Sequence, residues 1–146
     1  MNEFFSNRLL QAIFLPWLVA QISKPIVDYI RKRKLNMSLL TTAGGMPSSH
    51  SALVCALATA VGLKEGVAST FFVIAFALAV VVMYDAAGVR RAASIQARML
   101  NRIIDELFQG HPISETHLRE LLGHTPFEVV VGAVLGIVGA WWWMTR

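Results

Sequence analysis

Four apolar segments alternate with polar stretches along the chain. They cover residues 9–30, 49–63, 67–84 and 127–144. A helix that crosses a membrane needs roughly 20 predominantly apolar residues, because the hydrocarbon core of a bilayer is about 30 Å thick. The second segment is short for a span and rich in alanine, whereas the third is the clearest of the four. The pattern therefore predicts about four transmembrane helices.

A different periodicity lies between the third and the fourth segment. Apolar side chains recur there at every fourth position among charged residues, at Ile95, Met99, Ile103 and Leu107. This spacing is typical of an amphipathic helix, which is expected to lie on the membrane with its apolar face in the lipid. A short second helix is expected to follow, so residues 89–122 are predicted to form an interfacial helical region.

The composition places the chain among integral membrane proteins. Of its 146 residues 55% are hydrophobic, and the mean hydropathy is +0.57. The charges are bunched and leave long neutral stretches, so a soluble fold would have no polar face. The predicted fold class is all-α, with residues 1–146 forming a single membrane-embedded helical bundle. The single cysteine, Cys55, lies in an apolar segment and is expected to fill the core.

Basic residues gather in two of the loops and indicate the orientation. Residues 31–34 are all basic, and the long loop before the fourth segment carries five arginines. By the positive-inside rule both loops are cytoplasmic and both termini lie outside. The basic residues do not alternate with exposed aromatic residues, so the pI of about 9.7 reflects membrane orientation and anionic lipids. No nucleic-acid partner is expected.

Two histidines lie where polar loops enter apolar helices. Pro47-Ser48-Ser49-His50 precedes the second segment, and His124-Thr-Pro-Phe-Glu128 opens the fourth. Helix N-termini attract anions through their unpaired N–H groups and the helix dipole. An imidazole can transfer protons near neutral pH. Ser48 and Ser49 could either cap the helix or donate hydrogen bonds to a phosphate.

Glu128 has two interpretations. It follows His124 by four residues, so on a helix its carboxylate could hold one imidazole nitrogen and leave the other as a nucleophile. Thr125-Pro126-Phe127-Glu128 is equally a capping box, with Thr125 as the N-cap. The sequence does not choose between the two.

More charged residues are predicted at the same membrane face. Lys24 and Arg31 are two helical turns apart and share a face, although such a pair commonly snorkels at a membrane boundary. Asp85, Arg90 and Arg91 follow the third segment. Alone they would form a local ion pair, but beside two histidines an arginine is a good clamp for phosphate oxygens. The cluster predicts a site for a phosphate head group.

These motifs resemble those of the type 2 phosphatidic acid phosphatase superfamily, which also contains the vanadium haloperoxidases. The family motifs are Lys-x6-Arg-Pro, Pro-Ser-Gly-His and Ser-Arg-x5-His-x3-Asp. Lys24 to Arg31 reproduces the first, with Lys32 in place of the proline, and residues 47–50 reproduce the second, with Ser49 in place of the glycine. His124 to Glu128 reproduces the end of the third, with glutamate in place of the aspartate.

The chain is most similar to the divergent bacterial branch of this superfamily, over nearly its whole length. Leu118 occupies the position of the arginine in the third motif. In the divergent branch the stretch from Tyr84 to Arg91 looks like the displaced arginine element.

The resemblance implies a multi-pass protein of the bacterial cell membrane that cleaves a lipid phosphate without a metal or other cofactor. His124 would attack phosphorus and form a phosphohistidine, Glu128 would orient it, and His50 would protonate the leaving oxygen. The phosphate would be bound by Lys24, Arg31, Ser48, Ser49 and an arginine of the Arg90-Arg91 pair, with Asp85 in support. Phosphatidylglycerol phosphate, phosphatidate and polyprenyl phosphates all fit as substrates.

Other functions also fit the sequence. A protein that binds or transports lipid phosphate without cleaving it would keep the same pocket, and vanadate-dependent oxidation would share it. A structural membrane protein explains each motif singly but not their clustering at one face. A metal site formed by His111, Glu115 and His117 has poor ligand spacing. Gly132 and Gly136 form a Gly-x3-Gly pair that is typical of helix packing and could support a homodimer.

Overall fold

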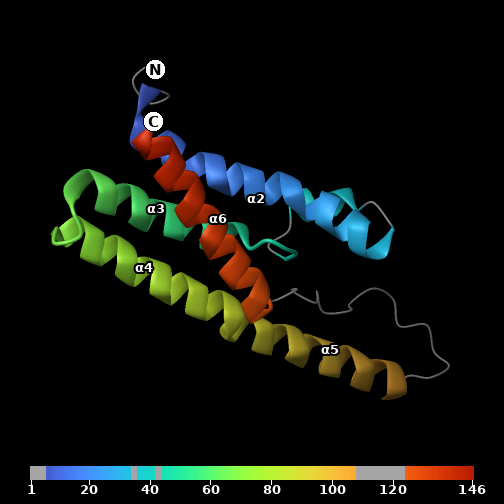
Figure 1. The fold of residues 1–146 in the computed structure, drawn as a ribbon. Coiled ribbons are helices and arrows are strands. Elements are labelled where there is room, and N and C mark those ends of the chain that lie inside the picture. Colours follow the sequence, from blue (N-terminus) through green and yellow to red (C-terminus); the bar gives the residue numbers. More distant parts are fainter. Residues whose placement is uncertain (1–5, 34–35, 42–43, 108–123) are drawn as a thin grey trace.

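The computed structural model describes residues 6–33, 36–41, 44–107 and 124–146, and these form a bundle of helices (Figure 1). The described residues contain no strand, which confirms the all-α fold class. The elements in chain order are α2 (Arg8–Lys32), the short 3-10 helix η1 (Met37–Leu40), α3 (Ser49–Glu65), α4 (Thr70–Ala87), α5 (Val89–Leu107) and α6 (Pro126–Thr145).

Three helices of the described chain are long and apolar enough to cross a membrane, namely α2, α4 and α6. The remaining predicted span, residues 49–63, corresponds to α3, which has 17 residues and is therefore about 26 Å long. The length and composition of the helices thus support three of the four predicted spans. The α3 helix runs between them inside the bundle.

The central position of α3 explains its alanine-rich sequence. Nine of its residues are buried, most of them alanine or serine, and it packs against α2, α4 and α6. Among the described residues α2 and α4 make no contact with each other, and they lie on opposite sides of α3 (Figure 1). Small side chains let the surrounding backbones come close. Cys55 is buried there beside Met83 of α4, as a core role predicts.

The tightest helix contact joins α6 to α3, which run in the same direction. Gly132 and Gly136 lie directly against the backbone carbonyls of Ser48 and Ala52, so a Cβ at either glycine would overlap a carbonyl oxygen. The Gly-x3-Gly pair therefore packs two helices within one chain, and a homodimer would have to use another surface.

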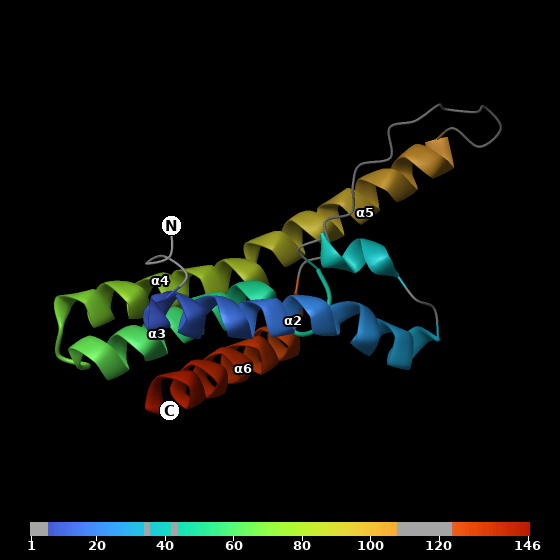
Figure 2. The same cartoon turned by 90° about the horizontal axis from the view of Figure 1, so that it is seen from above.

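The polar motifs lie at one end of the bundle. Helices α3 and α6 begin at the end where α2 and α4 finish, whereas α2 begins and α6 ends at the opposite end (Figures 1 and 2), where Arg8 donates a hydrogen bond to the carbonyl of Trp143. The prediction that the polar clusters share one face is confirmed as a feature of the fold. Its assignment to the cytoplasmic side stays a prediction.

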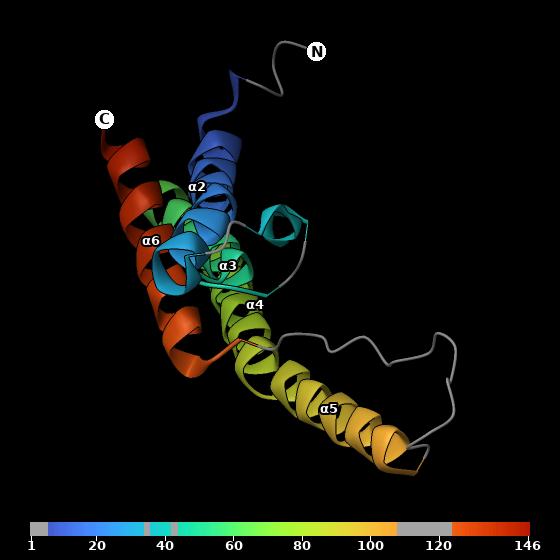
Figure 3. The same ribbon diagram turned by 90° about the vertical axis from the view of Figure 1, so that its right-hand side faces the viewer.

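Helix α5 leaves the bundle. Gly88 alone separates it from α4, and α5 continues in nearly the same direction beyond the other helices (Figures 1 and 3). Ile95, Met99 and Ile103 are at least 40% exposed, so the apolar face of the helix is uncovered. A helix that continues the line of a membrane span cannot lie flat on that membrane, so the predicted interfacial placement would require a bend at Gly88. The rest of the predicted region, 108–122, lies outside the described residues.

We expect Gly136→Ala to lower the stability of the folded chain by about 1–3 kcal/mol, because the added methyl group meets backbone atoms that cannot rotate away. Thermal unfolding of the purified protein in detergent would measure the change. Val134→Leu adds a carbon on the exposed side of the same helix and serves as the control. An unchanged unfolding midpoint with an altered oligomeric state would instead assign the glycine to a contact between chains.

Candidate active site

A cluster of buried polar side chains occupies the end of the bundle where α3 and α6 begin. Lys24, Ser48, Ser49 and His124 are each at most 2% exposed, although most buried side chains of the chain are apolar. Burying a polar or charged group within membrane spans is costly unless it is hydrogen-bonded, and such groups commonly mark functional sites. The four residues come from α2, the start of α3 and the residues just before α6.

Glu128 serves both of the roles that the sequence left open. Its Oε2 lies 3.3 Å from Nδ1 of His124 and also accepts a hydrogen bond from the backbone N–H of Thr125 at 3.0 Å. The Thr125 hydroxyl in turn accepts from the backbone N–H of Glu128, which completes the capping box. Because an ionised carboxylate can only accept, it favours the proton on Nδ1. The lone pair of the neutral ring is then on Nε2.

The second imidazole comes from the first turn of α3. The ring centroids of His50 and His124 are 6.5 Å apart, and the ring planes are inclined by 61°. His50 is half-buried, whereas His124 is enclosed. At this separation, both rings can reach atoms of one phosphoryl group. His124 is anchored by the Glu128 carboxylate and is the more deeply buried of the two histidines.

Lys24 reaches the same place from the middle of α2. Its ammonium donates to the Ser49 hydroxyl at 3.1 Å and to Oε1 of Gln21 at 2.8 Å. The side-chain amide of Gln21 also donates to the backbone carbonyls of Leu39 and Leu40 in η1. Gln21 therefore joins the η1 loop to the lysine and directs the ammonium toward the start of α3.

Gln21 was not among the predicted site residues. A glutamine one helical turn before Lys24, inside an otherwise apolar segment, is the signal that could have identified it. Its role still depends on η1, because the carbonyls that it binds lie 18 and 19 residues further along the chain. Such a partner cannot be read from helical spacing.

Ser48 has a structural role. It is fully buried and is the N-cap of α3, where its hydroxyl accepts from the backbone N–H and the hydroxyl of Ser51. Its own backbone N–H donates to the carbonyl of Glu128 at 3.1 Å. These contacts favour capping over phosphate binding for Ser48, and they tie the starts of α3 and α6 together.

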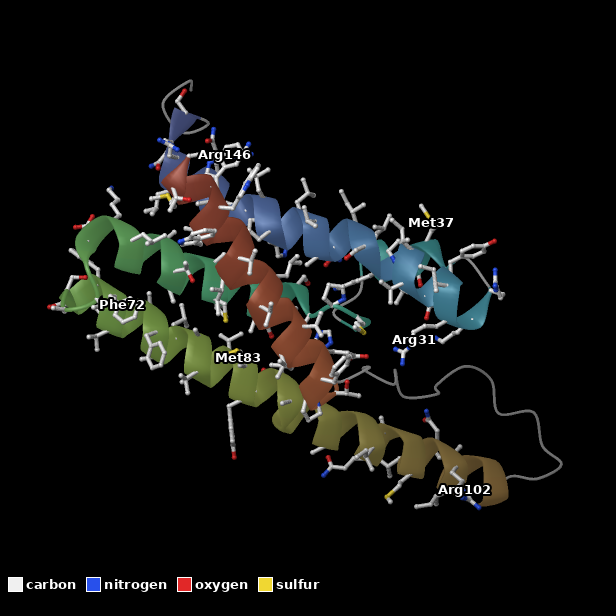
Figure 4. The ribbon with its side chains drawn as sticks, in the orientation of Figure 1. Arg31, Met37, Phe72, Met83, Arg102 and Arg146 are labelled. Atoms are coloured by element: carbon white, nitrogen blue, oxygen red, sulfur yellow. The ribbon has the colours of Figure 1, made fainter. Side chains whose placement is uncertain are left out.

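Arg31 and Asp85 lie at the same end but are less enclosed than the four buried residues. Arg31 is exposed in the last turn of α2. In the view of Figure 4 its side chain points from α2 toward α5. Asp85 is half-buried in the last turn of α4. Arg90 and Arg91 are in the first turn of α5, and their side chains lie outside the described part of the structure.

The described residues contain no group of three histidine, cysteine, aspartate or glutamate side chains close enough to hold a metal ion. The alternative ligands His111, Glu115 and His117 lie outside those residues. What the site does contain is a buried cation, two imidazoles and the N-terminus of α3. This combination suits the binding of an anion and nucleophilic attack on it.

A known protein family and a known bacterial protein are similar to this chain over most of its length. A family model described as the divergent PAP2 family matches residues 5–139, a range that includes every residue of the site. The uncharacterized membrane protein YuiD of Bacillus subtilis is 38% identical over 147 residues, which cover 93% of each chain. No solved structure matches the chain significantly.

The two roles of Glu128 can be separated by substitution. We expect both Thr125→Ala and Glu128→Ala to cost about 1 kcal/mol of stability through the lost cap. Only Glu128→Ala should change the tautomer of His124, because the contact with Nδ1 is made by the Glu128 carboxylate. Nitrogen NMR of histidine-labelled protein would show Nδ1 protonated in the wild type and in Thr125→Ala. Equal spectra for the two variants would contradict the role of the carboxylate in holding the ring.

Proposed function

Because the chain belongs to the divergent PAP2 family, we propose that it is a membrane phosphatase that hydrolyses a lipid phosphate without a metal ion. The observation that carries the proposal is the pairing of His50 with a carboxylate-bound His124 beside a buried lysine. Phosphatidylglycerol phosphate, phosphatidate and polyprenyl phosphates are the candidate substrates. All of them present a phosphate group at the membrane surface.

The reaction proceeds in two steps. In the first, Nε2 of His124 attacks phosphorus and the bond from phosphorus to the lipid oxygen breaks, while protonated His50 gives its proton to that oxygen. This releases the lipid alcohol and leaves a phosphohistidine. In the second, neutral His50 takes a proton from water, whose oxygen attacks phosphorus and releases inorganic phosphate from His124. Both imidazoles then have their starting protonation states.

Positive charge around the phosphate lowers the barrier. Lys24 supplies a fixed ammonium, and Ser49 is held next to it. The N-terminus of α3 adds its dipole and its N–H groups. Arg31 and an arginine of the Arg90-Arg91 pair complete the clamp. Groups held rigidly in a dry site stabilise the extra negative charge of the transition state more strongly than water does.

The proposed substrate face is the cytoplasmic side of a bacterial cell membrane. The site lies at the bundle end that carries the basic residues 31–33 and the start of α5. The positive-inside rule assigns such an end to the cytoplasm. The start of α2 and the end of α6 lie at the opposite end, which would face outside.

A second candidate is a protein that binds lipid phosphate without cleaving it. The observation that favours it is the third motif, in which Leu118 stands at the arginine position. Such a protein would keep the phosphate contacts of Lys24 and Ser49 and make no use of the nucleophile.

Phosphate release from a panel of lipid phosphates in detergent, with EDTA present, tests the proposal. We expect His124→Ala to abolish release and His50→Ala to lower it by about 10²–10⁴-fold, the usual contribution of a general acid. His111→Ala and His117→Ala are the matched controls, since these histidines belong to no motif. Activity that EDTA removes would overturn the metal-independent mechanism. Binding without release in the wild type would favour the second candidate.

Gln21 is expected to act as a positioning residue through Lys24. Gln21→Leu removes an acceptor from the ammonium and the anchor of η1, and we expect kcat/KM to fall about tenfold. Gln21→Glu keeps an acceptor for Lys24 but loses the donation to η1. Recovery of activity in Gln21→Glu, with KM rather than kcat restored, would assign the effect to the lysine. Equal losses in both variants would assign it to the loop.

A further inference from the structure

An apolar groove of about 490 Å³ lies between α2 and α6. Leu15, Pro16 and Val19 line it from α2, and Leu135, Val138 and Trp142 are among the residues that line it from α6. Val19 and Val138 are each more than half exposed, so the groove is open along the outside of the bundle. Both walls belong to helices that can cross a membrane, so hydrocarbon chains are the surrounding solvent.

The groove has a closed floor. Gly139 faces the ring of Pro16, and a Cβ at this glycine would come within 2.8 Å of the proline Cγ. The two helices therefore touch at this level because one residue lacks a side chain and the other has a flat ring. On either side of this contact, larger side chains hold the walls apart and leave space that no residue of the described chain fills.

The groove is aligned with the candidate active site along α6. Leu135, Gly139 and Trp142 follow Glu128 by 7, 11 and 14 residues, so all of them fall on the same face of the helix as the carboxylate. With a rise of 1.5 Å per residue, the groove begins about 10 Å from Glu128 and extends to about 21 Å from it. A chain attached to a phosphate at His124 would enter the groove by following this face.

We propose that the groove holds a hydrocarbon chain of the phosphorylated lipid whose head group occupies the active site. The inference rests on the proposed function, because the phosphate site is what selects this lipid among the lipids of the membrane. The groove is apolar, it opens to the hydrocarbon region, and its upper end lies two helical turns below the phosphate site. A lipid with very short chains cannot reach it, so chain length becomes a determinant of affinity.

Val138→Trp tests the proposal by filling the groove, and Ile137→Trp is the matched control. Ile137 is the adjacent residue, points away from the groove lining and is 47% exposed. In lipid-free amphipol, thermal unfolding would be followed against dihexadecanoyl phosphatidate and dibutyryl phosphatidate. We expect Val138→Trp to weaken binding of the long-chain lipid about tenfold, with the short-chain lipid unaffected. Ile137→Trp should match the wild type with both lipids.

The groove and the chemistry can fail independently in this experiment. If neither the wild type nor the two variants release phosphate from the long-chain or the short-chain phosphatidate, the phosphatase proposal fails. The comparison of binding affinities still decides the role of the groove. Equal affinity of the wild type and Val138→Trp for the long-chain lipid would overturn the inference. Dihexadecanoyl phosphatidylcholine is the third arm. If Val138→Trp weakens its binding by the same factor, the groove holds bulk membrane lipid and the inference is also overturned.

Discussion

The contact between α3 and α6 is the constraint on which the rest of the structure depends. Two glycines of α6 lie against the backbone of α3, and the Ser48 N–H donates to the Glu128 carbonyl at the top of the pair. These contacts fix two helix starts side by side and in the same direction. His50 and His124 are close because their helices are close, so the geometry of the candidate site follows from backbone packing.

A second constraint is the cost of burying polar groups among membrane helices. The bundle meets it with two sets of hydrogen bonds. In the first, η1 carbonyls accept from Gln21, and Gln21 and Ser49 accept from Lys24. In the second, the Glu128 carboxylate holds both Thr125 and His124. Each bond orients its partners, so the hydrogen bonds that make burial tolerable also fix the directions of the side chains in the candidate site. The same hydrogen bonds therefore stabilise the buried polar groups and hold their side chains in fixed orientations.

Helix α6 packs along two other helices, and the two seams differ. The seam between α3 and α6 is closed by glycine, alanine and serine and has no room for a ligand. The seam between α2 and α6 is held open by larger side chains and runs in line with Glu128. A single helix, α6, thus carries the carboxylate at its start, the packing glycines on one face and the proposed chain groove on another. Helix α5 stands apart from both seams and extends the end of the molecule that carries the site.

The sequence by itself determined the helices, the class of protein and the motif residues at the helix starts. Those features are local, since apolar length, helical period and capping patterns depend on residues a few positions apart. The same locality explains why Glu128 stayed ambiguous, why the glycine pair was as compatible with a dimer as with internal packing, and why Gln21 was missed. The glycine pair and Gln21 were decided only by the tertiary structure, because each depends on a partner from another helix or loop, whereas Glu128 proved to contact both of its local partners, His124 and Thr125. The tertiary structure also set the direction of α5, which an amphipathic pattern cannot specify, because the pattern identifies an apolar face and not the surface that covers it.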